Sequence, residues 1–316
     1  MTYIGVDLAW GEGTAAKRAN ETGLALLDES GVILDAGWAR GIDAVTEWVV
    51  DRAGPGTVIA IDAPLVIPNE SGMRLAERQV GMAYGNRKVA ANASNTAMGW
   101  QGGVALLQRL EVAGFAYTDG IRPPTDETPV FFECYPYTTL VGMAELGYDV
   151  ERPRYKRLDK TLTAPLGRER RARECDELIR RMLTLDDARP PLRLASHPLT
   201  RELAVTPSPI DDVPYKHRED LLDAVLCAWT AAIWHRFGDE RTQILGADDT
   251  PDARGRRATI VAPARPEQRV AGRPMRAPTA RRGPTVRHPV SARPARPATT
   301  GSRTTTGSPA APPSPD

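Results

Sequence analysis

Apolar and polar positions in the first part of the chain predict a run of short strands. The segments Tyr3–Ala9, Gly23–Leu27 and Val32–Trp38 are rich in apolar side chains, and the short connectors between them carry Gly and polar residues. This spacing is typical of an antiparallel meander. Apolar side chains then recur at intervals of three and four over residues 42–52, which predicts an amphipathic helix.

Two further apolar runs, Thr57–Ile61 and Val130–Tyr135, are rich in β-branched or aromatic residues and predict buried strands. Helical patterns cover Gly102–Ala113, Thr138–Leu146, Arg168–Leu183 and Arg218–Phe237, and a short final strand is expected at Ala258–Ala262. Three antiparallel strands followed by two helix-crossed parallel ones form a mixed sheet with helices on its faces. We therefore predict an α/β protein with a ribonuclease-H-like mixed five-stranded sheet, flanking helices and helical insertions over residues 1–265.

Asp7 is an acidic residue within the first predicted strand. Because side chains alternate along a strand, Asp7 points to the opposite face from Val6 and Leu8. Its neighbours on that face, Gly5 and Ala9, are small and leave space around the carboxylate. Aspartate is a poor strand former and is costly to bury alone. The position therefore predicts a cation, a helix N-terminus or a hydrogen-bonding partner beside Asp7.

Two later strands also carry acids. Asp62 ends the strand segment Val-Ile-Ala-Ile-Asp (58–62) and is followed by Ala63 and Pro64. Ligands of parallel α/β sheets bind beyond the carboxyl ends of strands. A purely structural Asp62 would instead hydrogen-bond the backbone of the following turn. Glu133 lies in an aromatic strand, where charged groups are rare unless paired. It is either a further acid of the site or the partner of an arginine.

The strongest local signal is a pair of acids on an apolar helix. From Leu221 to Trp234 the predicted helix is apolar around nearly its whole circumference, so it should be buried. Asp223 is the only carboxylate in that stretch, and Asp220 lies three residues earlier on the same face. Two adjacent buried carboxylates raise each other's pKa unless a cation lies between them. The pair therefore predicts a bound metal.

The acids together predict a site for Mg²⁺ or Mn²⁺. These hard cations take oxygen ligands, and Mg²⁺ is usually held by a few carboxylates together with water and phosphate. Two such ions about 4 Å apart can stabilise the attacking and leaving oxygens of phosphodiester hydrolysis. We expect the metal ligands to be Asp7, Asp62, Asp220 and Asp223, with Glu133 added to them as the fifth catalytic acid.

Four motifs resemble those of one known family: GVDLAW (5–10), AIDAPL (60–65), ECYP (133–136) and EDLLDAVLCAWTA (219–231). It is the predicted ribonuclease-H-like nuclease family known as domain of unknown function 429. The resemblance covers residues 2–265, where RRATIVAPAR is similar to the family's closing segment. The D-x-x-D helix is also similar to that of Holliday-junction resolvases. By position, the resemblance implies that Asp7 is the central first-strand ligand, Asp62 the fourth-strand acid, and Asp220 and Asp223 the last-helix acids, with Glu133 as an additional acid in the pocket.

Basic residues near these acids are candidates for substrate binding. Arg74 and Arg78 lie one turn apart, and Lys156 lies in the basic stretch 152–160. Such side chains could hold the phosphates of a nucleic-acid substrate. A solvated face of mixed charge, with Glu151 and Asp159 interleaved, is the alternative.

Charge is distributed unevenly along the chain. Residues 251–316 contain 13 Arg and three acidic residues, a net charge of +10 that leaves −9 on residues 1–250. The acidic part opposes tight duplex binding unless arginines form a local groove, the tail supplies attraction or the substrate is small. Residues 271–316 are rich in Pro, Arg and Ala with few large apolar side chains, which predicts a disordered tail.

Composition excludes other classes of protein. No run approaches the ~20 apolar residues that span a bilayer, and the first ten residues lack a basic region and a cleavage site. The three cysteines have no C-x-x-C spacing and the four histidines form no H-E-x-x-H motif. We therefore expect a cytoplasmic protein with no membrane partner.

Three functions are compatible with the pattern. The first is a metal-dependent phosphodiesterase, a nuclease that hydrolyses DNA or RNA with two metal ions. The second is an actin- or sugar-kinase-like phosphotransferase, because GVDLAWGEGT could form a phosphate loop, although such enzymes normally contain two copies of the fold. The third is a non-catalytic binding module that keeps the sheet for packing.

Overall fold

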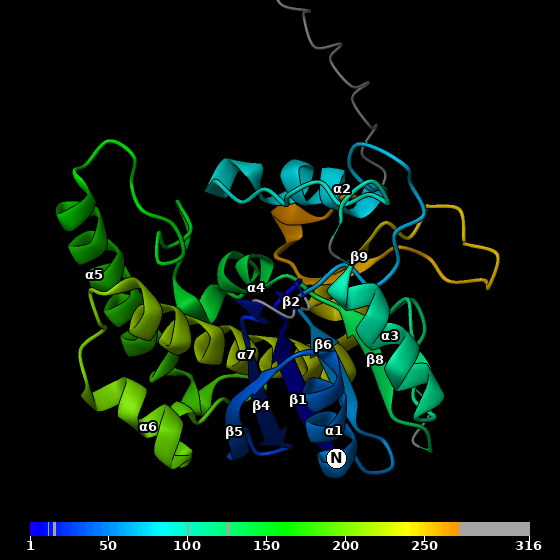
Figure 1. The fold of residues 1–316 in the computed structure, drawn as a ribbon, viewed down its shortest axis with the longest axis horizontal. Coiled ribbons are helices and arrows are strands. Elements are labelled where there is room, and N and C mark those ends of the chain that lie inside the picture. Colours follow the sequence, from blue (N-terminus) through cyan, green and yellow to red (C-terminus); the bar gives the residue numbers. More distant parts are fainter. Residues whose placement is uncertain (12, 15–16, 100, 125–126, 272–316) are drawn as a thin grey trace, which may run out of the picture. The chain divides into compact units, whose positions relative to one another are not determined.

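The strands form one mixed six-stranded sheet and two small strand pairs. The computed structural model describes residues 1–271 apart from 12, 15, 16, 100, 125 and 126. Its main sheet has the order β5-β4-β1-β6-β8-β7 (Figure 1). These strands are β1 (Thr2–Asp7), β4 (Glu21–Asp28), β5 (Ile33–Arg40), β6 (Val58–Ile61), β7 (Ala116–Tyr117) and β8 (Val130–Glu133). The small pairs are β2 (Gly13–Thr14) with β3 (Lys17–Arg18), and β9 (Thr242–Leu245) with β10 (Ile260–Pro263).

The pairing confirms an α/β protein with a mixed sheet. Strand β4 is antiparallel to both β1 and β5, whereas β6 is parallel to both β1 and β8. The predicted number of five strands is wrong, because β7 adds a parallel edge strand beside β8. With only two residues, β7 is too short to show periodicity in the sequence. The expected last strand is present as β10, but it pairs with β9 rather than joining the main sheet.

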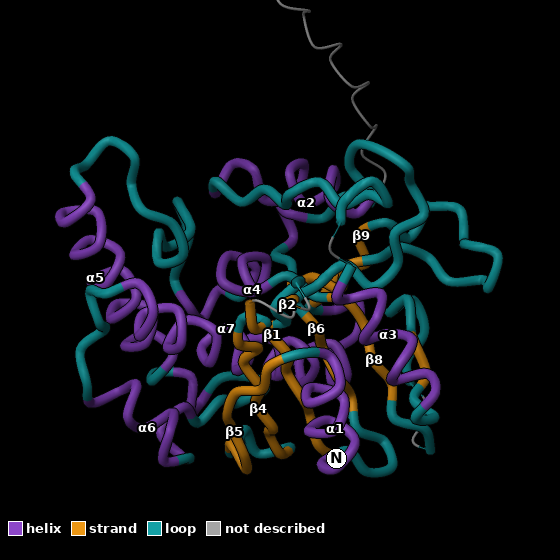
Figure 2. The backbone as a smooth tube through the Cα atoms, viewed as in Figure 1, coloured by secondary structure: helices purple, strands orange, loops and turns teal. Residues whose placement is uncertain are grey.

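Helices cover both faces of the main sheet (Figure 1). The α-helices are α1 (Ile42–Arg52), α2 (Leu75–Tyr84), α3 (Gly102–Val112), α4 (Pro136–Gly142), α5 (Ala164–Met182), α6 (Pro198–Val205) and α7 (Asp212–Phe237). Short 3₁₀ helices lie at Gly85–Arg87, Ala144–Leu146, Leu185–Asp187, Leu194–Ser196, Gly238–Glu240 and Pro266–Gln268. Apolar side chains of α1 and α3 pack on one face, and those of α7 pack on the other. Helices α5 and α6 lie to one side of the sheet, beyond β5 (Figure 2).

Strand β1 separates the two apolar clusters as its alternation predicts. Ile4 and Val6 belong to the cluster under α1 and α3, whereas Tyr3 belongs to the cluster under α7. Asp7 therefore points to the α7 face of the sheet. Helix α7 is buried without interruption from Arg218 to Trp234, which confirms the expected burial of the apolar helix.

Two glycines allow α7 to lie directly on the sheet. A Cβ atom on Gly5 would lie 1.9 Å from the Ala224 carbonyl oxygen, and one on Gly23 would lie 2.0 Å from that of Asp220. No side chain fits into such contacts, so glycine is required at both positions for this close approach. The contacts fix the height of α7 over β1 and β4.

The packed region extends slightly past the predicted end at residue 265. The side chain of Gln268 is fully buried and donates a hydrogen bond to the Val141 carbonyl oxygen. Of the predicted tail, Ala271 alone is described, and 272–316 lie outside the described residues. In the described part of the chain, no helix combines the length and apolar character needed to cross a bilayer. Cys134, Cys175 and Cys227 are buried free thiols.

Candidate functional site

Four of the predicted carboxylates converge on the α7 face of the sheet. The Asp7 carboxyl group lies close enough to the side chains of Asp62 and Asp220 to add to burial in raising the pKa of each. Asp223 lies one turn along α7 from Asp220, and its charge acts on that of Asp62. Asp7, Asp220 and Asp223 are all buried. We call Asp7, Asp62, Asp220 and Asp223, together with Glu219, the acid cluster.

Strand register and helix spacing produce this convergence. Strands β1 and β6 are parallel with Val6 opposite Ile61, and the Asp62 main-chain N–H donates to the Val6 carbonyl oxygen at 2.8 Å. Asp7 and Asp62 are thereby neighbours at the carboxyl ends of two adjacent strands. Because Asp220 lies over Gly23, which pairs with Asp7, the first turn of the buried part of α7 lies directly above these ends.

Two lysines lie within the acid cluster. The Nζ atom of Lys156 lies 2.5 Å from Oδ2 of Asp223 and 3.6 Å from Oδ2 of Asp62. The Nζ atom of Lys216 lies 2.5 Å from Oδ1 of Asp220 and 3.2 Å from Oε1 of Glu219. Each ammonium group thus bridges two carboxylates. Lys216 is more than half exposed, whereas Lys156 is largely covered.

Tyrosine hydroxyls hold the Lys156 segment against α7. The Tyr155 hydroxyl donates to Oδ1 of Asp223 at 2.5 Å, and the Tyr215 hydroxyl donates to the Tyr155 carbonyl oxygen. Both tyrosines are fully buried. The segment 155–156 therefore delivers one neutral donor and one cation to the same carboxylate.

Burial and repulsion by neighbouring carboxylates shift the pKa values of four members of the cluster upward: Asp62, Glu219, Asp220 and Asp223. Burial is the largest cause in every case: it raises the pKa of Asp220 to about 9 and that of Glu219 to about 7, and it places the pKa of Asp62 well above its usual range. Burial alone would lower the pKa of Lys156, but attraction by Asp223 and Asp62 raises it. Five carboxyl groups thus share two ammonium groups. When ionised, the buried cluster carries more negative charge than its two lysines neutralise.

The chemistry of the donors fits a hard divalent cation, although the carboxylates are not arranged around one here. All donors are carboxylate oxygens, which Mg²⁺ and Mn²⁺ prefer. Asp223 Oδ2 is buried and makes no hydrogen bond within the described residues; its close neighbour is the Lys156 ammonium, at 2.5 Å. Within the described ranges, no three His, Cys, Asp or Glu side chains are placed to hold a metal ion together. The ammonium groups lie between carboxylates, so an ion bound there would compete with Lys156 and Lys216 for the same oxygens.

Glu133 does not join the cluster. It pairs in register with Ile61 and lies two residues after Phe131, and both of these belong to the apolar cluster under α1 and α3. Its carboxylate accepts two hydrogen bonds from the Arg74 guanidinium, at 2.6 and 2.8 Å, and one from the Leu65 main-chain N–H. The alternative of an arginine partner is therefore the one that the structure shows.

The same ion pair corrects the expectation that Arg74 binds substrate. Arg74 is buried, and its guanidinium also contacts Glu77 at 2.8 Å and the Val66 carbonyl oxygen at 3.1 Å. It is fully engaged and holds the loop that follows Asp62. Arg78 is exposed on α2 and donates to the Met73 carbonyl oxygen, without a contact to the cluster among the described residues. Of the three predicted basic residues, only Lys156 lies in the cluster.

Sequence reasoning missed Tyr155, Lys216 and Glu219. Lys216 lies four residues before Asp220 and three before Glu219, a spacing that places these side chains on one face of a helix. That signal could have identified the lysine. Tyr155 belongs to a segment without regular secondary structure, where no period indicates which side chains point inward.

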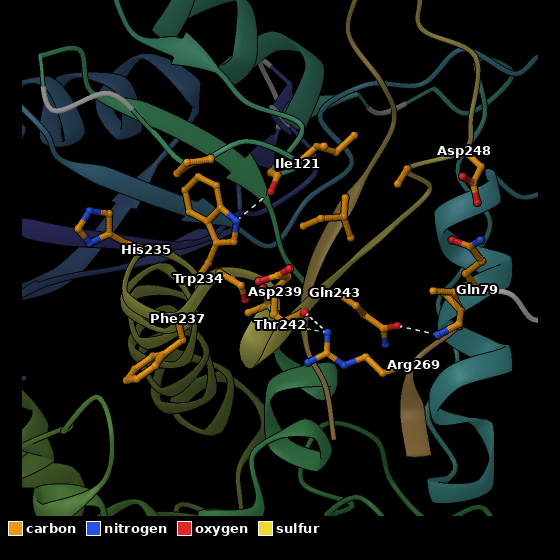
Figure 3. A pocket seen from close by; sticks show the side chains of 17 residues that line it. Gln79, Ile121, Trp234, His235, Phe237, Asp239, Thr242, Gln243, Asp248 and Arg269 are labelled. Atoms are coloured by element: carbon orange, nitrogen blue, oxygen red, sulfur yellow. Dashed lines mark hydrogen bonds between the residues drawn. The ribbon is translucent and has the colours of Figure 1, made fainter. Parts of the chain in front are cut away.

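A separate pocket lies near the other end of α7 (Figure 3). It has a volume of about 740 Å³ and is lined in part by Trp234, Gln243 and Arg269. The Trp234 indole donates to the Gly120 carbonyl oxygen, and Arg269 is occupied by carbonyl oxygens of Asp239 and Thr242. Trp234 lies three turns of helix beyond Asp223, so this pocket is not part of the acid cluster.

Comparisons with known proteins identify one family. The model of the family described as "Protein of unknown function (DUF429)" matches residues 5–250. This range includes every residue of the acid cluster. No curated protein and no solved structure matches the chain.

Proposed function

The chain belongs to the DUF429 family, and we propose that it is a metal-dependent phosphodiesterase, a nuclease acting on DNA or RNA. The observation that carries the proposal is the convergence of Asp7, Asp62 and the two α7 aspartates at the carboxyl ends of β1 and β6. The proposed fold is ribonuclease-H-like. The order β5-β4-β1-β6-β8, with β4 antiparallel to its neighbours, supports it.

The ions we propose are Mg²⁺ or Mn²⁺, held by Asp7, Asp62, Asp220 and Asp223. When bound, such ions supply an activated water and stabilise charge on the attacking and leaving oxygens of a phosphodiester. They would also neutralise the negative charge that adds to burial in raising the pKa values of Asp62 and Asp220. The acid cluster therefore has an electrostatic reason to bind cations.

Residues of the chain itself would position the reactants. Tyr155 fixes one oxygen of Asp223 and leaves the other, Oδ2, facing the cluster. Lys156 lies between Asp62 and Asp223, so it is placed to contact a phosphate oxygen once cations take over the carboxylates. Burial of the cluster limits the number of water molecules that compete for these groups.

The phosphotransferase alternative has less support. It normally needs two copies of the fold with a nucleotide between them, and the described residues form one main sheet with a single acid cluster. A non-catalytic module would retain the carboxylates without cleaving anything. Binding of ATP would favour the first alternative, and failure of divalent cations to change the melting temperature would favour the second.

Cleavage of labelled oligonucleotides tests the proposal. We expect cleavage of DNA or RNA that needs Mg²⁺ or Mn²⁺, stops in EDTA and is lost in Asp7→Asn. The matched control is Asp43→Asn, which makes the same chemical change at a carboxylate of α1 that is 84% exposed, and it should cleave like the natural chain. Cleavage that survives Asp7→Asn, or no cleavage of any oligonucleotide with either ion, overturns the proposal.

A further inference from the structure

Three cationic side chains beside the acid cluster have no acidic partner. In the part of the chain that the structure describes, Lys88, Arg152 and Arg157 form no ion pair with a carboxylate; the two arginines bond only to carbonyl, hydroxyl or amide oxygens. Neighbouring arginines differ, since Arg87 pairs with Glu267 and Arg154 with Glu151. Cations without an ion-pair partner among the described residues are thus present beside the acid cluster, and we call Lys88, Arg152 and Arg157 the basic patch.

The ring of Tyr137 joins the basic patch to the Lys156 ammonium of the cluster. The Arg152 guanidinium lies 4.3 Å from the centre of the Tyr137 ring, and the Lys156 ammonium lies 5.4 Å from the same centre. Arg152 also donates to the Lys88 carbonyl oxygen at 2.8 Å, so the loop after α2 is held beside it. Because Lys156 pairs with Asp62 and Asp223, the patch begins where the acid cluster ends.

Tyr135 marks the side of the cluster on which the patch lies. Tyr135 follows the end of β8, and its hydroxyl donates to the Ala90 carbonyl oxygen at 3.1 Å. The charges of Asp62, Arg152 and Arg157 all act on this phenol. The patch therefore lies near the carboxyl ends of the parallel strands, where the proposed chemistry takes place.

The charge of the rest of the chain makes this arrangement informative. Residues 1–250 carry a net charge of −9, which opposes binding of a polyanion to this part of the chain. Cations without acidic partners at the edge of a buried acid cluster give a polyanion a favourable place to lie beside the proposed catalytic groups. Phosphate groups of a nucleic acid are recognised by arginine and lysine side chains in this way.

We infer that Lys88, Arg152 and Arg157 bind the phosphates of a nucleic-acid strand that continues beyond the bond held at the acid cluster. The inference rests on the proposed function and narrows it. The substrate is an extended strand rather than a mononucleotide or another small phosphodiester. Lys156 contacts the phosphate nearest the carboxylates, and the basic patch contacts the phosphates that follow.

The test measures binding without cleavage. Fluorescence anisotropy of labelled single-stranded DNA and RNA of about 20 nucleotides, longer than a usual single-strand site, is followed in EDTA with the full chain. In Lys88→Gln/Arg152→Gln/Arg157→Gln we expect at least a tenfold loss of affinity at low salt. The slope of log affinity against log salt should fall by about two, because each phosphate contact to a single strand contributes roughly 0.7.

The matched control removes three charges at the opposite end of the sheet. Arg193, Arg201 and Arg236 are exposed. The main-chain N–H of Arg193 and the guanidinium of Arg236 contact carbonyl oxygens of the β4–β5 turn, and the guanidinium of Arg201 contacts that of Ala195, just before α6. Their triple Gln variant should bind within twofold of the natural chain. Equal losses in the two triple variants overturn the inference. Arg152 also supports the loop at Lys88, so its replacement could weaken binding by disturbing that loop. The double variant Lys88→Gln/Arg157→Gln keeps Arg152, and its melting temperature should equal that of the natural chain. It must still lose affinity and salt dependence, by less than the triple variant.

The outcome also separates this inference from the proposed function. If the natural chain cleaves oligonucleotides and the patch variant binds and cleaves equally well, the inference fails alone. If the patch variant loses binding but the natural chain cleaves nothing with Mg²⁺ or Mn²⁺, the proposed function fails and a polyanion-binding surface remains.

Discussion

Gly23 of β4 lies directly beneath the backbone of Asp220. A Cβ atom on Gly23 would lie only 2.0 Å from the Asp220 carbonyl oxygen. The strand and the helix that carry the candidate site are therefore in backbone contact. An acid of the site is held in place by the absence of a side chain on the sheet below it.

Replacing this glycine should damage the fold and the site together. Gly23→Ala forces α7 away from β4, and we expect a loss of at least about 2 kcal/mol in the free energy of unfolding. The control is Gly37→Ala on neighbouring β5, where nothing lies within 4 Å of the added carbon. It should be neutral or stabilising by about 0.4–1 kcal/mol. Denaturant unfolding of both variants measures the difference, and equal stabilities contradict the account.

Asp223→Asn and Asp223→Ala should differ in stability but not in activity. Sequence reasoning alone predicts that Asp223→Ala leaves the fold intact or stabilised. The structure changes that expectation, because alanine leaves the buried Tyr155 hydroxyl and the Lys156 ammonium without their partner, at a cost of about 3–5 kcal/mol. Asparagine still accepts from Tyr155. Both variants should lose metal-dependent cleavage. Equal melting temperatures of Asp223→Asn and Asp223→Ala would contradict a structural role for the contact with Tyr155.

Glu133→Gln should affect stability and leave the affinity for cations unchanged. Glu133 lies on the other face of the sheet, in a buried ion pair with Arg74. Removing its charge leaves the guanidinium with only Glu77 and lowers stability by about 3 kcal/mol. Calorimetric titration with Mn²⁺ and thermal melting test the two halves of this prediction. If Glu133→Gln instead lost tenfold or more in Mn²⁺ affinity and kept its stability, Glu133 would be a member of the cation site.

Without divalent cations, stability should fall as pH rises. The pKa of Asp220 in the folded protein is about 9, against an ordinary value of 3.8. Between these values the folded state holds a proton that the unfolded state has released, so the stabilisation is complete below the ordinary pKa and is lost as pH rises through the folded one. Asp220→Asn should remove this dependence, which cannot exceed about 1.4 kcal/mol per pH unit.

Unfolding in EDTA between about pH 5 and about pH 9 measures this effect of a single ionisable group. The natural chain should lose stability relative to Asp220→Asn over that range. The prediction is wrong if the difference in free energy of unfolding between the two proteins stays constant over this range, or if the natural chain becomes the more stable one as pH rises. Either result would show that Asp220 is ionised without a cation.

The sequence predicted the strands well because their patterns were simple. The alternation around Asp7 was enough to assign its face, since Ile4 and Val6 on one side and Tyr3 on the other are buried in different clusters. Likewise, a carboxylate at Asp223 in an otherwise apolar helix was a reliable sign of a buried acid. In both cases one local rule determined where the side chain points.

Glu133 shows where such rules fail. Strand β8 is buried on both faces, so Phe131 and Phe132 are equally apolar and the pattern does not tell which face Glu133 shares. Only the register of β8 against β6 shows on which face of the sheet the Glu133 side chain lies. The roles of Arg74 and Lys156 depended in the same way on tertiary contacts, because nothing local distinguishes an arginine that meets Glu133 from one that meets solvent.

Anomalous diffraction from a crystal soaked in Mn²⁺ tests the central claim most directly. The account predicts a peak bounded by the carboxylates of Asp7 and at least one α7 aspartate, with the Lys156 ammonium moved away from Asp223. The natural chain with Mg²⁺, which gives no such peak, is the control. The account is contradicted if Mn²⁺ gives anomalous peaks at other positions in the crystal but none between the carboxylates of the acid cluster, and Lys156 still bridges Asp62 and Asp223.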